Sequence, residues 1–266
     1  MDILLKASHR FFFAIFVLCF SLPSWSAVEK WQLNLGPYIS NIEYAEPNVM
    51  KEKGSLSGLT GSMTLYNSLA MIRIEVNYAD GDMDYNGSGR IDDIPNTLWE
   101  TRGLLGRSVL LGDSKLLTVF IGLGYRNLND DSSGRISSTG HYGYEREQLY
   151  YYAPIGIELK NRLSSSDWHV SGRAEYDNFF YGKNTSYLGT IPGYSDVQLE
   201  QNYGHGYRFS LEFEKALSPQ GGAIIVNPFY RHWNIEKSQV TYNSRGGWYE
   251  PANTSDEYGV AVLLSF

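Results

Sequence analysis

Apolar and polar residues alternate at every second position along most of this chain, in stretches of roughly 10 to 16 residues. In the last stretch Tyr258, Val260, Val262, Leu264 and Phe266 share one face, and the residues between them share the other. Such alternation is typical of β-strands, whose successive side chains point to opposite faces. The pattern predicts ten strands, at 30–44, 55–66, 70–80, 97–110, 115–128, 145–160, 167–181, 199–215, 222–236 and 257–266.

The connections between these strands are alternately short and long. That order is typical of bacterial outer-membrane barrels, which have short periplasmic turns, long outer loops and an even number of strands. A closed barrel also leaves no strand edge unpaired in lipid. We therefore predict an all-β fold, a transmembrane antiparallel up-and-down β-barrel of ten strands, with eight or twelve strands as alternatives. The predicted turns are Asn67–Ser68, Leu111–Ser114, Leu163–Ser166 and Ser218–Gly221, and the predicted loops are 45–54, 81–96, 129–144, 182–198 and 237–256.

Aromatic residues on the apolar face fall near both ends of the predicted strands. Their amphipathic rings are enriched where a membrane meets water, so they give a second indication of a barrel. We expect Trp31, Trp168, Phe213 and Phe266 at the periplasmic rim, and Tyr78, Trp99, Tyr125, Tyr176, Phe180, Tyr203 and Tyr230 toward the outer loops.

The first 26 residues have the order of a secretory signal peptide. Lys6 and Arg10 precede an apolar run at 11–22, and small residues follow it. The run has roughly 12 residues, below the ~20 that a membrane-spanning helix needs. We predict a signal peptide at 1–26, a barrel domain at 27–266, and a location in the outer membrane of a Gram-negative cell. The only cysteine, Cys19, lies in the signal segment.

Net charge narrows the choice of partners. The chain has a formal charge of -7, with 42% hydrophobic and 19% charged residues. Because Asp2, Lys6 and Arg10 give the signal segment a net charge of +1, the mature chain carries -8. This acidic balance argues against nucleic acid as a partner. The expected partners are outer-membrane lipid and lipopolysaccharide, and an extracellular ligand held by the long loops.

Opposite the apolar face, the alternation places charged side chains of both signs inside the barrel. A ten-stranded barrel is narrow, since only barrels of about 16 strands leave a wide channel. Unpaired buried charges are costly, so we expect these charges to pair in a closed, polar lumen. The predicted interior residues are Arg73, Glu75, Glu100, Arg102, Arg126, Arg146, Glu158, Lys160, His169, Arg173, Glu175, Asp177, Glu200, Arg208, Glu212, Glu214 and Arg231.

His169 and Ser171 share the inward face of one predicted strand. A histidine near a serine has the residue types for base-activated nucleophilic attack, and this His-x-Ser pair loosely resembles outer-membrane lipid A deacylases. Side chains two apart on a strand lie about 6.6 Å apart along it, however, and these two face the lumen rather than lipid. We therefore expect a ladder of ion pairs along this strand, which also carries Arg173, Glu175 and Asp177, rather than a catalytic pair.

The segment Asp82–Asp93 has the spacing of part of a calcium loop. From Asp84 it reads D-x-N-x-S-G-x-I-D, with oxygen ligands at alternate positions and a glycine for the sharp turn. The twelfth position, where a bidentate acid normally closes the site, is Pro95. We therefore favour a solvated acidic hairpin loop, with calcium binding as the alternative.

No other motif predicts a site. His141, His205 and His232 have no neighbours at ligand spacing, and we expect them at the membrane interface rather than in a metal site. The sequence has no glycine-rich phosphate loop, no cysteine–histidine cluster and no nucleophile elbow. We accordingly assign no catalytic, cofactor-binding or metal-binding residue and no cofactor.

The predicted architecture resembles the omptin/adhesin group of outer-membrane barrels, as do three short stretches. That resemblance implies ten strands and five outer loops. In omptin proteases an Asp pair and an Asp–His pair at the mouth activate water. Asp82 and Asp84 match the first pair, but Gly182–Ser186 offers neither Asp nor His for the second, so the base is missing. The matching stretches are Gln201–Tyr203, Ala216–Pro219 and Phe229–Asn234.

The loops are rich in tyrosine and small polar residues, which suit adaptable surface contacts. Together with the incomplete catalytic set, this predicts a non-enzymatic surface protein: an adhesin, a receptor or a structural barrel. An omptin-like protease or lipid hydrolase, and a small channel, are the alternatives.

Overall fold

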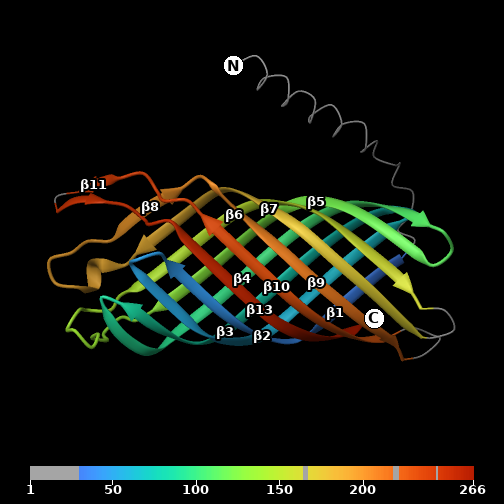
Figure 1. Cartoon of the computed structure of the whole chain (residues 1–266), viewed down its shortest axis with the longest axis horizontal. Helices are drawn as coiled ribbons and strands as arrows, with labels where there is room; N and C mark the ends of the chain where they lie inside the picture. Colours follow the sequence, from blue (N-terminus) through green and yellow to red (C-terminus); the bar gives the residue numbers. More distant parts are fainter. Residues whose placement is uncertain (1–29, 164–166, 218–221, 244) are drawn as a thin grey trace, which may run out of the picture.

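The computed structural model describes residues 30–163, 167–217, 222–243 and 245–266, which form a closed antiparallel β-barrel (Figure 1). The predicted signal peptide at 1–26 lies outside the described residues, as do most of two predicted turns. Within the described ranges, no helix is long and apolar enough to cross a membrane. The elements are β1 (Lys30–Glu46), β2 (Met50–Asn67), β3 (Ala70–Gly87), β4 (Gly89–Leu111), β5 (Lys115–Asp131), β6 (Glu145–Arg162), β7 (Trp168–Ser186), the short helix η1 (Leu188–Thr190), β8 (Val197–Gln201), β9 (Gly204–Ala216), β10 (Ala223–Ile235), β11 (Thr241–Asn243), β12 (Gly246–Trp248) and β13 (Asn253–Ser265).

The ring of strands closes without an edge. β1 pairs with β2 on one side and with β13 on the other, so the first and last strands are neighbours. The pairing of β6 with β7 completes the ring. β8 and β9 follow each other along β7 and count as one strand of the barrel, whereas β11 and β12 form a separate hairpin. The predicted ten-stranded, antiparallel, up-and-down barrel is therefore confirmed.

The strand made of β8 and β9 is interrupted at 202–203. The sequence pattern treats 199–215 as one strand with strict alternation, which places Glu200 in the lumen. In the structure the interruption shifts the alternation by one residue, so Leu199 and Gln201 are buried and Glu200 faces outward. The predicted inward position of Glu200 is therefore wrong.

The first two predicted long loops are strand hairpins. A short turn joins β1 to β2, and β3 and β4 turn at Ser88 alone, so ladder pairing continues through 45–54 and 81–96. Met83 and Ile94 alternate with the polar residues of these segments and are fully buried. The predicted loops are wrong here because the strands rise above the membrane, where their outward face meets water and is as polar as a loop.

The two ends of the barrel differ. The C-terminus lies near the end with the short turns, and β8 and β11 lie at the opposite end (Figure 1). Between the ends the outward face is apolar, and Ile39, Leu59 and Ile74 are each more than half exposed. Apolar side chains around a closed barrel require a lipid environment. All the predicted rim aromatics except Tyr125, which is partly buried, are exposed on this face.

The interior is layered along the barrel axis. Inward residues of β6 run from Glu158 in the inner half, through Tyr152 and Tyr150, to Arg146 near the outer end. Buried side chains of β7 and β10 continue the middle, apolar layer, which contains Tyr150, Tyr152, Phe179, Trp233 and Ile235. The predicted polar lumen is therefore right for the charged residues, but it is incomplete because an apolar layer lies between two charged ones.

Candidate functional site

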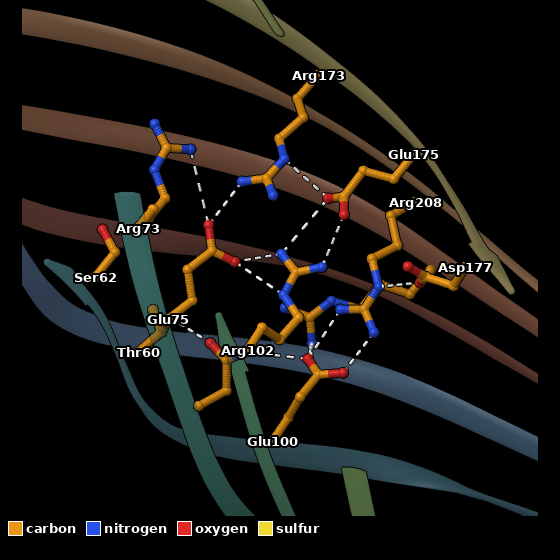
Figure 2. Close-up of polar contacts among 12 residues, drawn as sticks. Thr60, Ser62, Arg73, Glu75, Glu100, Arg102, Arg173, Glu175, Asp177 and Arg208 are labelled. Atoms are coloured by element: carbon orange, nitrogen blue, oxygen red, sulfur yellow. Dashed lines mark hydrogen bonds and ion pairs between the residues drawn. The ribbon is translucent and has the colours of Figure 1, made fainter. Parts of the chain in front are cut away.

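Charged side chains from seven strands form two adjoining groups of ion pairs across the inner half of the lumen, most of which are drawn in Figure 2. We name them together the inner charge layer. Five arginines face six carboxylates there, so nearly every charge has an opposite partner. The members are Arg73, Arg102, Arg173, Arg208 and Arg231 with Glu75, Glu100, Glu158, Glu175, Asp177 and Glu257.

Glu75 is the centre of the first group (Figure 2). Its carboxylate accepts a hydrogen bond from Arg102 Nε at 2.9 Å and another from Arg173 Nη1 at 2.7 Å. Arg102 Nη1 also donates to Glu175 Oε2 at 2.9 Å. Because each ion is bonded to two or more partners on different strands, the group ties opposite walls of the barrel together.

Glu100 is the centre of the second group. Arg208 binds it through two nitrogens, with Nη1 donating to Oε2 at 2.8 Å, and Arg208 also pairs with Asp177. The Tyr152 hydroxyl donates to Glu100 Oε1 at 2.6 Å. Bidentate, charge-assisted bonds of this kind fix geometry as well as supply energy.

The apolar layer covers the inner charge layer on its outer side. Tyr152 and Trp233 pack edge to face with ring centroids 4.9 Å apart, and the Arg208 guanidinium lies over both rings. Tyr152 and Trp233 are at most 1% exposed and Arg208 is 4% exposed, so no water-sized passage runs beside them. A polar chamber of about 110 Å³ lies on the inner side, and its lining residues do not include those of the outer mouth. The lumen is therefore closed.

A larger cavity, of about 540 Å³, occupies the outer mouth above this closure. Its walls come from the β1–β2 turn, the β3–β4 hairpin, the loops at 132–144 and 187–196, and residues 248–251. Ligand sites in proteins commonly have this size and are mostly apolar. We name it the mouth cavity; its aromatic and aliphatic lining is Val49, Met50, Tyr85, Ile91, Tyr142, Tyr144, Leu188, Ile191, Tyr194, Val197, Leu199, Trp248 and Tyr249.

The floor of the mouth cavity is a second group of charges, which we name the outer cluster. Arg146 donates to Glu46 at 2.8 Å, to Asp130 at 3.0 Å and to Glu52 at 3.2 Å. Glu250 lies beside them. Arg146 is the sole lysine or arginine among the described lining residues, so four carboxyls share a single cation.

Glu250 is the member of the outer cluster that a loop supplies. Its Oε1 accepts hydrogen bonds from Asn184 Nδ2 at 2.8 Å and from the Tyr44 hydroxyl at 3.3 Å. Burial raises the pKa of the Glu250 carboxyl to about 7, against the opposing effect of the Arg146 guanidinium, and the Glu46 carboxylate adds to the rise. This carboxyl therefore changes charge near neutral pH.

The predicted pair His169 and Ser171 is not a catalytic pair in this geometry. The Ser171 hydroxyl donates to Glu212 Oε2 at 3.1 Å rather than to the imidazole. His169 Nδ1 lies 3.7 Å from Glu214 Oε1, and Lys160 pairs with the same carboxylate. The expected ladder of ion pairs is confirmed for this strand, where Arg173, Glu175 and Asp177 all pair inside the lumen.

Asp82 and Asp84 are exposed on the outward face of β3, while Met83 between them points inward. Their carboxylates therefore face away from the mouth cavity. Asp84 Oδ1 accepts a hydrogen bond from the Asp93 backbone, and the segment is a strand hairpin rather than a loop. Over the described ranges, no group of three or more His, Cys, Asp or Glu is placed to hold a metal ion.

The three histidines singled out in the sequence fall in two places. His205 stacks on Tyr176 on the outward face, and His232 Nδ1 pairs with Asp256 at 2.9 Å, which agrees with their expected interfacial position. His141 instead lines the mouth cavity, so its predicted place at the membrane interface is wrong. It lies in a loop that folds over the mouth. In a loop, the alternation of the sequence does not predict which way a side chain points.

The outer cluster was not predicted as a group. Glu46, Glu52, Asp130 and Glu250 all fall in segments that the sequence pattern assigns to loops. One signal was present for three of them: Glu46 continues the inward parity of β1, Glu52 that of β2 and Asp130 that of β5. Glu250 carries no such signal, because only the folding of its loop brings it to the mouth.

Comparisons with known proteins place the fold. No protein-family model matches this sequence, and no curated protein matches it. Among solved structures, the outer-membrane protease OmpT from Escherichia coli aligns over 92% of this chain and 99% of its own, at 10% identity and a TM-score of 0.60. The translocator domain of the autotransporter NalP from Neisseria meningitidis aligns over 98% and 96%, at 11% identity and a TM-score of 0.49. The Pseudomonas putida toluene transporter TodX aligns over 90% of each chain, at 8% identity and a TM-score of 0.36.

The likeness to OmpT concerns the fold alone. This chain is a closed, ten-stranded barrel of the outer-membrane type, and its omptin-like architecture agrees with the resemblance seen in the sequence. The identity of 10% carries no activity from one protein to the other.

Proposed function

We propose that this protein is a non-enzymatic receptor of the outer membrane, which holds an extracellular ligand in the mouth cavity. The observation that carries the proposal is that the lumen is open at the outer mouth and closed below it. A cavity of about 540 Å³ lies between the outer loops, and a closed charged and apolar interior lies below it. Such a site suits retention of a ligand at the surface better than passage through the barrel.

Two alternatives lose support from the same geometry. The omptin-like alternative assigned its acids to Asp82 and Asp84, which point away from the mouth. Three acids that do line the mouth, Glu46, Glu52 and Asp130, bond to Arg146, and His141 Nδ1 bonds to Thr139 rather than to an acid. A channel needs a continuous water path, and Tyr152 and Trp233 occupy the lumen without exposed surface. The receptor function requires neither feature.

Anchoring in lipopolysaccharide is part of the proposal. Lys51 and Lys53 are exposed on the outward face of β2, above the apolar band, beside a groove of about 380 Å³ that Arg90 also lines. Cations at this level suit the phosphate groups of lipopolysaccharide. Replacing Lys51 and Lys53 by glutamine should lower the lipopolysaccharide that co-purifies with the folded barrel, and an unchanged amount would contradict this contact.

The receptor function is tested by filling the cavity. The purified barrel in lipid nanodiscs is titrated with a panel of amphipathic small molecules of every charge state, and binding is measured by calorimetry. A saturable binder should lose affinity when Ser186, which lines the cavity, is changed to tryptophan. Ser57→Trp is the matched control, because Ser57 is exposed on the outward face. Binding that both variants retain would contradict the proposal.

A further inference from the structure

The charge of the mouth cavity is unbalanced. Its described lining holds one arginine, Arg146, against the carboxyls of Glu46, Glu52, Asp130 and Glu250. All five are at least 93% buried. Burial raises the pKa of Glu52 to about 8 and that of Glu250 to about 7, and it also raises the pKa of Asp130, so these carboxyls hold protons more tightly than free acids do. When all four are ionised and Arg146 is matched to one of them, three negative charges remain without a cation among the described lining residues. Buried charge of one sign is unfavourable unless a counter-charge lies near it, so the mouth cavity is complementary to a cation.

The walls above this floor are aromatic. Six rings line the cavity, and they come from four different segments of the chain. Aromatic faces attract ammonium groups, and sites built from several such rings are used to recognise methylated ammonium ions. The rings are Tyr85, Tyr142, Tyr144, Tyr194, Trp248 and Tyr249.

The mouth already uses this kind of contact within the protein. The Arg245 guanidinium lies over the Tyr194 ring, 4.1 Å from its centroid. At the floor, the Arg146 guanidinium lies 5.0 Å from the centroid of Tyr44. Both contacts place a cation on a ring at the mouth, and Tyr194 itself belongs to the wall.

From these observations we infer that the mouth cavity binds an organic ammonium compound with an apolar body, its cation directed at the outer cluster and its body against the aromatic walls. The inference deepens the receptor function proposed above and rests on it. A volume of about 540 Å³ accommodates a molecule larger than the ammonium group alone.

The test compares probes that differ in charge but not in size. The barrel in nanodiscs is titrated with benzyltrimethylammonium and with benzylsulfonate, and in parallel with choline and its uncharged isostere neohexyl alcohol. Each cation should bind at least about tenfold tighter than its partner. Glu250→Gln should weaken binding of benzyltrimethylammonium about fivefold, by removing one carboxylate that Tyr44 and Asn184 hold in place.

Glu236→Gln is the matched control. Glu236 is an exposed acid of the same loop and does not line the cavity, so this variant changes the charge of the loop by the same amount. If Glu250→Gln and Glu236→Gln weaken the binding of benzyltrimethylammonium equally, the effect comes from the general surface charge, and the inference is overturned.

The remaining outcomes separate the two proposals. If benzylsulfonate or neohexyl alcohol binds as tightly as its cationic partner, and Ser186→Trp removes that binding, the cation inference is wrong and the receptor function stands. If another compound of the panel binds in the cavity while all four probes fail, the result is the same. If nothing binds, both proposals are wrong.

Discussion

The inner charge layer and the outer cluster are built alike, from arginines and carboxylates on the inward faces of neighbouring strands, but their charges are balanced differently. In the inner charge layer, five arginines meet six carboxylates. Above it, Arg146 alone meets four. The balanced inner charge layer holds the walls together and closes the lumen. The outer cluster has more carboxyls than cations, so the cavity above it favours a positively charged ligand.

This difference shows how one construction serves two purposes. Burying the charges of either group costs free energy because they lose contact with water. In the inner charge layer, opposite charges of the protein offset that cost, whereas in the outer cluster a bound cation would contribute to the offset.

Removing an arginine from the inner charge layer should have the largest effect. Arg208→Met leaves Glu100 and Asp177 buried without their main cation, and we expect the free energy of unfolding to fall by about 3–5 kcal/mol. Urea unfolding in lipid vesicles, followed by heat-modifiable migration on gels, measures the loss. Arg90→Met, in an exposed pair with Asp92, is the control and should leave stability unchanged. A similar loss in both variants would remove the special role of the layer.

The same neutral substitution should have opposite effects in the two regions. Glu100→Gln should destabilise the barrel by about 3 kcal/mol, because Arg208 loses its bidentate partner. Glu52→Gln should stabilise it at pH 8, by about 1 kcal/mol, because it removes one of several like charges around Arg146. The urea midpoints of the two variants and of the unaltered protein, measured in one buffer, test both expectations. Loss of stability in Glu52→Gln would show that the outer cluster is balanced after all.

Stability of the mouth should depend on pH through Glu250. Its pKa is raised to about 7 in the folded protein from the ordinary value of 4.5, so the folded state holds the proton more tightly. Stability is then fully present below about pH 4.5, falls as the pH rises toward 7, and is level above it. Arg146, Glu46, Asp130 and Tyr44 face this carboxyl and set the size of the effect.

Hydrogen exchange of 245–252 at pH 5 and pH 8 measures this change. Exchange should be faster at pH 8, after correction for the intrinsic rate, and Glu250→Gln should abolish the difference. The opposite order of protection at the two pH values would contradict the assignment.

Binding of a cation should show the reverse pH dependence. Ionised Glu250 attracts the ligand, so the affinity for benzyltrimethylammonium should rise several-fold as the pH increases through about 7. Calorimetric titrations across this range test it, with Glu250→Gln showing a smaller rise. An affinity that falls as the pH rises would count against the outer cluster as the cation site.

Changes on the outward face of β3 should have the smallest effect. Asp82→Asn together with Asp84→Asn alters two exposed carboxylates that face away from both charged regions. We expect ligand binding at the mouth and urea stability to stay within experimental error. A loss of binding would mean that this hairpin acts on the mouth cavity from outside.

Alternation along the strands predicted most of the barrel. It worked wherever one face meets lipid, because there every outward position must be apolar and the period of two is strict. It failed at 81–96, where the strands stand in water and their outward face is as polar as a loop, although Met83 and Ile94 keep the inward face apolar. It failed at Glu200 as well, because an interruption of one strand shifts the side of every residue on its outer part.

The candidate site was less predictable than the fold. Arg102, Glu100 and Arg208 were assigned to the lumen by parity alone, and the structure adds only which of them pair. The mouth cavity depends on how three loops fold over the barrel. Side chains such as His141 and Glu250 have no periodic neighbours to indicate their direction, so local sequence does not determine their place.

Measurements of conductance through the barrel would show whether the lumen is closed beneath the mouth cavity. The folded protein is inserted into planar lipid bilayers in concentrated salt, with a general porin as the positive control. Because Tyr152, Trp233 and the ion pairs of Arg208 fill the lumen, we predict insertion without discrete current steps. Reproducible steps of constant size from the pure, folded barrel would contradict the account.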